Sequence, residues 1–172
     1  QVGVPARTAT RVSYATGRFV VTEESEGCGR LFVLDESGAE LDVPGVPEPP
    51  PCQNPHHTPF AEGTLSPNGR LLAYVAQTWA SEDFHPGVVA SELVVVELDG
   101  GQELLREQVT SEGESRIISL DFDGDWVVMA RTPAGEPLVA NEVVGLSVSG
   151  ARFLARVPGV SSVRLLQVPL EG

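Results

Sequence analysis

A short motif that occurs three times along the chain is the strongest constraint on its fold. In each copy a strand-like segment leads into a turn that contains glycine, and an apolar run follows the turn. The three turn glycines are Gly17, Gly69 and Gly124, which places the copies 52 and 55 residues apart. Repetition at such a period is typical of tandem arrays of β-sheet units.

The second half of each copy contains a further hairpin. The pairs Ser37-Gly38, Asp99-Gly100 and Ser149-Gly150 separate apolar runs, and glycine readily adopts the positive φ that tight hairpin turns require. Each copy therefore has four strands, and we place the units at about 7–46, 60–110 and 115–158 within one domain, 1–172. The sequence predicts an all-β fold of tandem four-stranded antiparallel sheets, arranged like the blades of a β-propeller.

One copy of the motif resembles the repeat of bacterial WD40-like propellers of the TolB type. In that repeat a Ser-Pro-Asp-Gly turn precedes a basic residue and an apolar strand, and here Ser66-Pro67-Asn68-Gly69 precedes Arg70 and an apolar run. The other two copies keep the glycine and the strand without the Ser-Pro pair. The resemblance implies a propeller fold that binds protein or carbohydrate partners across one face.

Three units leave a propeller ring open, because such rings usually have four to eight blades. Three arrangements are consistent with the sequence: a distorted small ring, a fragment of a longer parent, or two copies that complete a six-bladed ring as a homo-oligomer. An extra apolar segment at 160–168 could supply a strand of a fourth unit or a closing strand for the first.

The charge of the chain limits its partners. Acidic residues number 24 against 11 basic ones, for a formal net charge of -13. Such a field repels nucleic acids and anionic membrane surfaces. No apolar run approaches the length of a membrane span, so we expect no membrane insertion. Protein and carbohydrate remain as the expected partners.

The two cysteines, Cys28 and Cys52, flank a strand pair and a proline-rich segment. A disulfide between them would close a loop of about 24 residues and stabilise the fold by roughly 3 kcal/mol. The alternative is a pair of reduced thiols. A disulfide would imply an oxidising compartment, and the chain starts at Gln1 without an initiator Met. We therefore expect a secreted, periplasmic or cell-surface location.

Two insertions, 44–62 and 77–91, interrupt the units, and insertions in repeat proteins are common sites of partner contact. The first contains seven prolines and is expected to be extended. The candidate ligand-binding residues lie in these insertions: His56, His57, Trp79, Asp83 and His85. The histidines and Asp83 could hold a transition metal, or the histidines could be solvent-exposed loop residues. Trp79 could stack on a sugar or a partner, or be partly buried.

The acidic run Asp121, Asp123 and Asp125 could bind calcium, but Gly124 falls between the second and third acidic residues and not after the third, where a calcium loop places it. We therefore interpret the run as a hairpin turn. No nucleophile elbow, metalloprotease motif or phosphate-binding loop is present, so we assign no catalytic residue and no cofactor.

These patterns lead to three hypotheses for the function. The first is a non-enzymatic, extracytoplasmic binding module that recognises a protein or a saccharide through its insertions. The second is a structural subunit of a surface assembly or filament, in which exposed sheet edges join copies. The third is a metal-dependent hydrolase with its site on the loops that carry the histidines.

Overall fold

The computed structural model describes residues 9–25, 28–46, 60–79, 88–111, 115–133 and 140–160. Within these ranges the chain forms twelve β-strands in three antiparallel four-stranded sheets, as the repeats predict, and no helix. Accordingly, this part of the chain contains no helix that is long and apolar enough to cross a membrane.

Each sheet is built from four consecutive strands. The first sheet contains β1 (Ala9–Ala15), β2 (Arg18–Ser25), β3 (Cys28–Asp35) and β4 (Glu40–Leu41). The second contains β5 (Phe60–Leu65), β6 (Leu71–Trp79), β7 (Val88–Glu97) and β8 (Glu103–Ser111). The third contains β9 (Ser115–Asp123), β10 (Trp126–Pro133), β11 (Ala140–Ser147) and β12 (Arg152–Val160).

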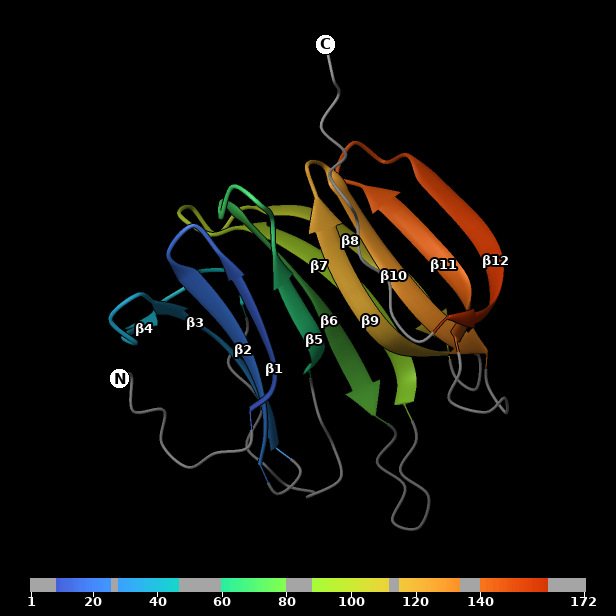
Figure 1. The fold of residues 1–172 in the computed structure, drawn as a ribbon, viewed down its shortest axis with the longest axis horizontal. Coiled ribbons are helices and arrows are strands. Elements are labelled where there is room, and N and C mark those ends of the chain that lie inside the picture. Colours follow the sequence, from blue (N-terminus) through green and yellow to red (C-terminus); the bar gives the residue numbers. More distant parts are fainter. Residues whose placement is uncertain are drawn as a thin grey trace.

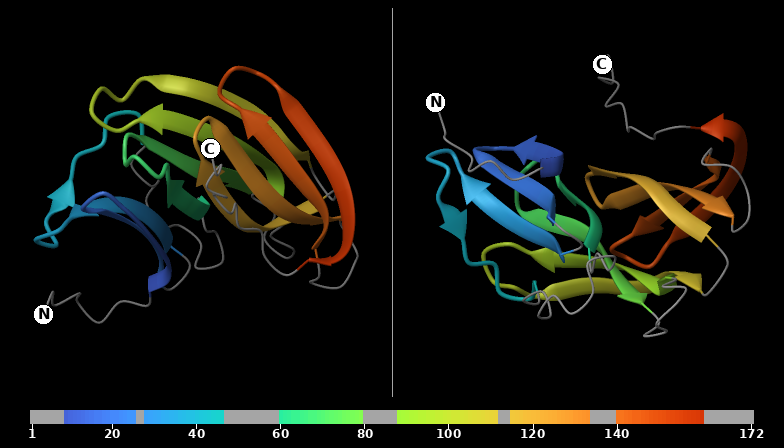
Figure 2. Two further views of the ribbon diagram at one scale, coloured as in Figure 1. Left: turned by 45° about the horizontal axis from the view of Figure 1, so that its top comes forward. Right: turned by 90° about the horizontal axis from the view of Figure 1, so that it is seen from below.

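The three sheets stand side by side in chain order, like consecutive blades around an axis (Figures 1 and 2). The first strand of each sheet is the innermost, and β5 lies against both β1 and β9. The second sheet is the middle one, and the first and third sheets cover its two faces. This arrangement confirms the predicted fold class.

The core consists of two apolar layers, one on each side of the middle sheet. Leu72 and Tyr74 of β6 face the first sheet, whereas Ala73 and Val75 face the third, and all four are fully buried. Successive residues of a strand point to opposite faces, so the continuous apolar run in β6 serves both layers. Burying a side chain of this size contributes roughly 1.5–3 kcal/mol.

Polar contacts fix how the first sheet meets the middle one. The Arg18 side chain donates to the Gly69 carbonyl at 3.0 Å and forms an ion pair with Asp99 at 2.8 Å. Deeper in the junction, the Ser13 and Thr64 hydroxyls lie 3.2 Å apart. The turn at Gly69 thus packs directly on the first hairpin.

The junction between the second and third sheets has a corresponding contact. Arg131 of β10 donates to the Val109 carbonyl of β8 at 2.7 Å and pairs with Glu142 at 2.8 Å. This pair is largely shielded from water, and hydrogen bonds that involve a charged group contribute roughly 1.5–3 kcal/mol.

Some predicted boundaries differ from the structure. The strands β6 and β7 extend into the expected insertion 77–91, since β6 ends at Trp79 and β7 begins at Val88. The fourth strand of the first unit, β4, has only 2 residues, whereas β8 and β12 have 9 each. β12 ends at Val160, and the rest of the expected strand 160–168 lies outside the described residues.

A glycine substitution tests the first junction. Gly69 has a φ of +67°, and a β-carbon there would collide with Thr16 Oγ1 and lie 3.3 Å from the Ala15 carbonyl. Gly124 has a φ of +54°, and a β-carbon there would meet no atom within 4 Å. We expect Gly124→Ala to lower the free energy of unfolding by about 1–2 kcal/mol, because alanine is strained at this backbone conformation. Gly69→Ala should lower it by about 1–3 kcal/mol more, because of the additional collision. Chemical unfolding measures both, and equal losses would contradict the packing described here.

Candidate interaction surface

The first sheet has an apolar face that points away from the middle sheet. Val20, Leu31 and Val33 point towards the middle sheet and join its core. The alternate positions therefore form the opposite face, which we call the outer apolar face. Its apolar residues are Val12 and Tyr14 from β1, Phe19 and Val21 from β2, and Phe32 and Leu34 from β3. Arg30 of β3 and Glu40 of β4 lie at its edge on the same side of the sheet.

Part of the outer apolar face is open to solvent. Val12 is 59% exposed and Tyr14 58%, which is unusual for large apolar side chains that lie together on a sheet. The Tyr14 and Phe19 rings pack with their centroids 4.8 Å apart. Val21, at the centre of the face, is buried, and Phe19, Phe32 and Leu34 are partly exposed. The face thus combines a packed centre with an accessible margin.

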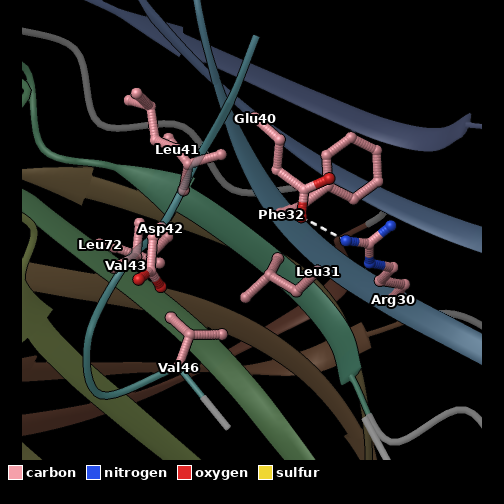
Figure 3. A pocket seen from close by; sticks show the side chains of 10 residues that line it. Arg30, Leu31, Phe32, Glu40, Leu41, Asp42, Val43, Val46 and Leu72 are labelled. Atoms are coloured by element: carbon pink, nitrogen blue, oxygen red, sulfur yellow. Dashed lines mark hydrogen bonds and ion pairs between the residues drawn. The ribbon is translucent and has the colours of Figure 1, made fainter. Parts of the chain in front are cut away.

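A cavity of about 360 Å³ lies at the outer edge of the same sheet, beside β3 (Figure 3). Apolar side chains from three segments line it, among them Leu31, Val43, Val46 and Leu72. Arg30, Glu40 and Asp42 also contribute to the lining and give it a polar side. Its volume is within the range of ligand pockets, which is about 300–1,000 Å³.

The chain leaves the sheet after β4 and thereby forms the far wall of this cavity. Val43 and Val46 pack on the core of the middle sheet, and the Val46 amide donates to the Val43 carbonyl at 3.2 Å. Gly45 has a φ of +89°, and a β-carbon there would lie 2.7 Å from the Gly101 carbonyl oxygen. The close approach to the middle sheet therefore depends on glycine.

Tyr74 of β6 connects this wall to the middle sheet through a hydrogen bond. Its hydroxyl donates to the Gly45 carbonyl at 3.2 Å, and its side chain is fully buried. Burial raises the pKa of the Tyr74 phenol, because desolvation disfavours the phenolate.

Arg30 marks the polar side of the cavity. Its guanidinium pairs with the Glu40 carboxylate and lies 5.3 Å from the centroid of the Phe32 ring. Both charged side chains are more than a third exposed, so their pairing adds little to stability. Their effect is to give the entrance a defined charge pattern next to an aromatic ring.

Most of the site residues expected from the sequence lie outside the described residues. This applies to His56, His57, Asp83 and His85, and to Cys52 of the expected disulfide. Trp79 is the last residue of β6, where its backbone pairs with Val88, and Cys28 is the first residue of β3. The roles of all these residues therefore stay predictions.

The acidic run on the third sheet does form a hairpin. Asp123 pairs with Trp126, and Gly124 between them has a φ of +54°. Across the described ranges, no group of three or more His, Cys, Asp or Glu side chains could hold a metal ion. Trp126 itself is only partly buried and packs against Phe153, with centroids 5.7 Å apart.

No family model and no curated protein matches this chain, but solved structures share its fold. A chain of a nidogen/laminin complex matches with TM-score 0.57 at 9% identity, over 91% of this chain and 51% of that one. TolB from Acinetobacter baumannii gives 0.51 at 18% identity, over 87% and 32% of the two chains. The Pan2 WD40 domain of Neurospora crassa gives 0.50 at 14%, over 90% and 42%.

These similarities confirm the β-propeller-like fold that the TolB-type repeat implies, at the level of fold alone. The chain spans about half the length of the matched chain in the nidogen/laminin complex, and a smaller share of the length of the other two chains. It is therefore similar to an arc of consecutive blades in a longer propeller chain.

Sequence reasoning did not identify the outer apolar face. A signal was present, because β1, β2 and β3 carry apolar residues at both odd and even positions. A strand of this kind has two apolar faces. What the sequence could not show is that only one of these faces would be covered by the middle sheet.

The phenol of Tyr74 gives a pH test of the cavity wall. Its pKa in the folded state is raised above the ordinary value of about 10, so its contribution to stability is present below pH 10 and is lost as the pH rises further. We expect Tyr74→Phe to remove this alkaline loss and to cost about 1 kcal/mol at neutral pH. Chemical unfolding measured between pH 7 and 11 tests this prediction. Tyr14→Phe is the control, and it should keep the alkaline loss of stability. Unchanged alkaline behaviour of Tyr74→Phe would contradict this role.

Proposed function

We propose that this protein is a non-enzymatic, extracytoplasmic binding module that recognises a protein partner through the outer apolar face of its first sheet. The observation that carries the proposal is the exposure of Val12 and Tyr14 beside further apolar residues on the same face. Exposed contiguous apolar surface on a folded domain typically marks an interaction site. Tyrosine is also among the residues enriched at protein interfaces.

The composition of the face favours a protein over a saccharide. Aliphatic and aromatic side chains make up most of the face, and the charged residues Arg30 and Glu40 at its edge already pair with each other. Saccharide recognition needs several convergent polar groups to replace the hydrogen bonds of water. In addition, one structure of similar fold is a nidogen/laminin complex, so a chain of this shape can take part in a protein assembly.

The charge of the chain suggests which residues surround the binding surface of the partner. With a net charge of -13, the protein attracts basic surfaces from a distance, and such attraction raises association rates. We therefore propose a partner with an apolar centre and basic residues around it. Association should slow at high ionic strength.

A second candidate is assembly with another copy of the same chain. Within the described residues the sheets form an arc, in which the first and third sheets each pack on the middle one. The outer apolar face of one copy could meet the third sheet of another, where Trp126 and Phe153 form a partly exposed aromatic pair. Two such contacts would complete a six-bladed ring.

One pair of variants tests both candidates. Tyr14→Asp places a charge on the outer apolar face, and Leu104→Asp is the matched control, because Leu104 is an exposed apolar residue (37%) on the middle sheet. We expect wild type and Leu104→Asp to retain the same protein from an extract, and Tyr14→Asp to lose it. With the purified partner, Kd should rise at least tenfold for Tyr14→Asp, which corresponds to about 1.4 kcal/mol.

Light scattering on the same three proteins separates the two candidates. A monomer at all concentrations supports a heterologous partner, whereas a wild-type dimer that Tyr14→Asp dissociates supports self-assembly. If Tyr14→Asp and Leu104→Asp behave alike in both measurements, the outer apolar face is not the binding surface and the proposal fails.

A further inference from the structure

The first sheet lacks most of its outermost strand. β4 has 2 residues and pairs only with Val33 and Leu34, although β3 is 8 residues long. The corresponding strands of the other sheets, β8 and β12, have 9 residues each. The part of β3 from Cys28 to Phe32 is therefore an edge that no strand of the described residues covers.

The hydrogen bonds of β4 show which backbone groups point outward along this edge. The Asp35 amide donates to the Ala39 carbonyl at 2.9 Å, and Val33 pairs with Leu41. In an antiparallel ladder, alternate residues direct their N–H and C=O groups to the same side. The backbone groups of Leu31 and Gly29 therefore point to the same outer side as those of Val33 and Asp35. They continue the β4 ladder along an edge that no strand of the described ranges occupies.

The cavity beside β3 lies where a longer fourth strand would run. Leu31 and Val33 line it from β3, Val43 and Val46 line it from the departing chain, and Leu72 contributes from the middle sheet. Figure 3 shows Leu31, Val43 and Val46 gathered on its apolar side, and Arg30 and Glu40 joined beside Phe32 on its polar side. Apolar side chains from a strand added here would be buried.

We propose that the open edge of β3 binds an extended peptide segment of the protein partner, which adds to the first sheet as the continuation of β4. Backbone hydrogen bonds to Gly29 and Leu31 would supply affinity. Apolar side chains at alternate positions of the peptide would enter the cavity, and this alternation would supply specificity. The inference deepens the proposed function and rests on it.

The charges at the entrance define the peptide further. Glu40 and Asp42 lie at the cavity with Arg30, which Glu40 already pairs. The net charge of these three groups is negative, as is that of the whole protein. The preferred peptide is therefore extended and basic, with small apolar residues at every second position. Prolines within it would be excluded wherever the peptide must donate to β3.

The test uses a displayed library of random 12-residue peptides selected against the full chain. We expect the recovered sequences to alternate apolar and basic or polar residues. A representative synthetic peptide is then measured for binding to wild type and to three variants. Gly29→Pro removes an outward amide, Arg30→Glu reverses the charge at the entrance, and Arg70→Glu is the control. Arg70 is likewise an exposed arginine paired with a glutamate, Glu97, but on the middle sheet.

We expect Gly29→Pro to weaken peptide binding at least tenfold and Arg70→Glu to change it less than twofold. Arg30→Glu makes the entrance more acidic and should tighten binding of a basic peptide severalfold. A second measurement avoids any effect of the variants on folding: methylating the backbone nitrogens of the peptide one at a time. Loss of binding at every second residue supports addition of a strand, because only alternate amides face β3.

Three results would overturn the inference: no peptide recovered above background, losses on N-methylation without a period of two, or equal binding by wild type, Gly29→Pro and Arg30→Glu. If partner capture still depends on Tyr14 while any of these is found, the proposed function stands and only the edge site fails. If capture is also insensitive to Tyr14→Asp, both fail.

Discussion

The structure depends on the burial of both faces of the middle sheet. β6 and β7 carry apolar residues at every position of their central segments, so that Leu72 and Val96 face one neighbour and Ala73 and Val95 the other. A sheet of this kind is stable only when both faces are covered. The first and third sheets provide the two covers, and the side-by-side arrangement of the three sheets follows from this requirement.

The same constraint explains where binding should occur. The first sheet also has two apolar faces, but the middle sheet covers only one of them, which leaves Val12 and Tyr14 exposed. Its fourth strand is short because the chain leaves the sheet after Leu41 to pack on the middle sheet near Tyr74. An exposed apolar face and an open strand edge therefore occur on the same sheet, and a partner could engage both.

The sequence predicts the strands and their grouping well, because hairpin glycines and apolar runs are local signals. It is harder to predict from the sequence which residues of the different units lie on the same face of their sheets. The turn glycines suggest that Gly17 and Gly69 occupy equivalent positions. In the first unit, however, the strand after the turn begins at Arg18, one residue after the glycine. In the second unit the turn is longer, Ser66 pairs with Leu71, and the strand begins two residues after the glycine. A shift of one residue reverses the face on which a side chain lies. The cavity was beyond prediction, because it depends on where a loop leaves the sheet.

The measurement that tests the central claim most directly is amide hydrogen exchange of the free protein, resolved by residue along β3. We expect the Leu31 amide, at the open edge, to exchange orders of magnitude faster than the amides of Val33, which pairs with β4, and Val95, in the middle sheet. Protection of Leu31 equal to that of Val95 would show that another segment already occupies the edge, and β3 would then have no open edge for a partner.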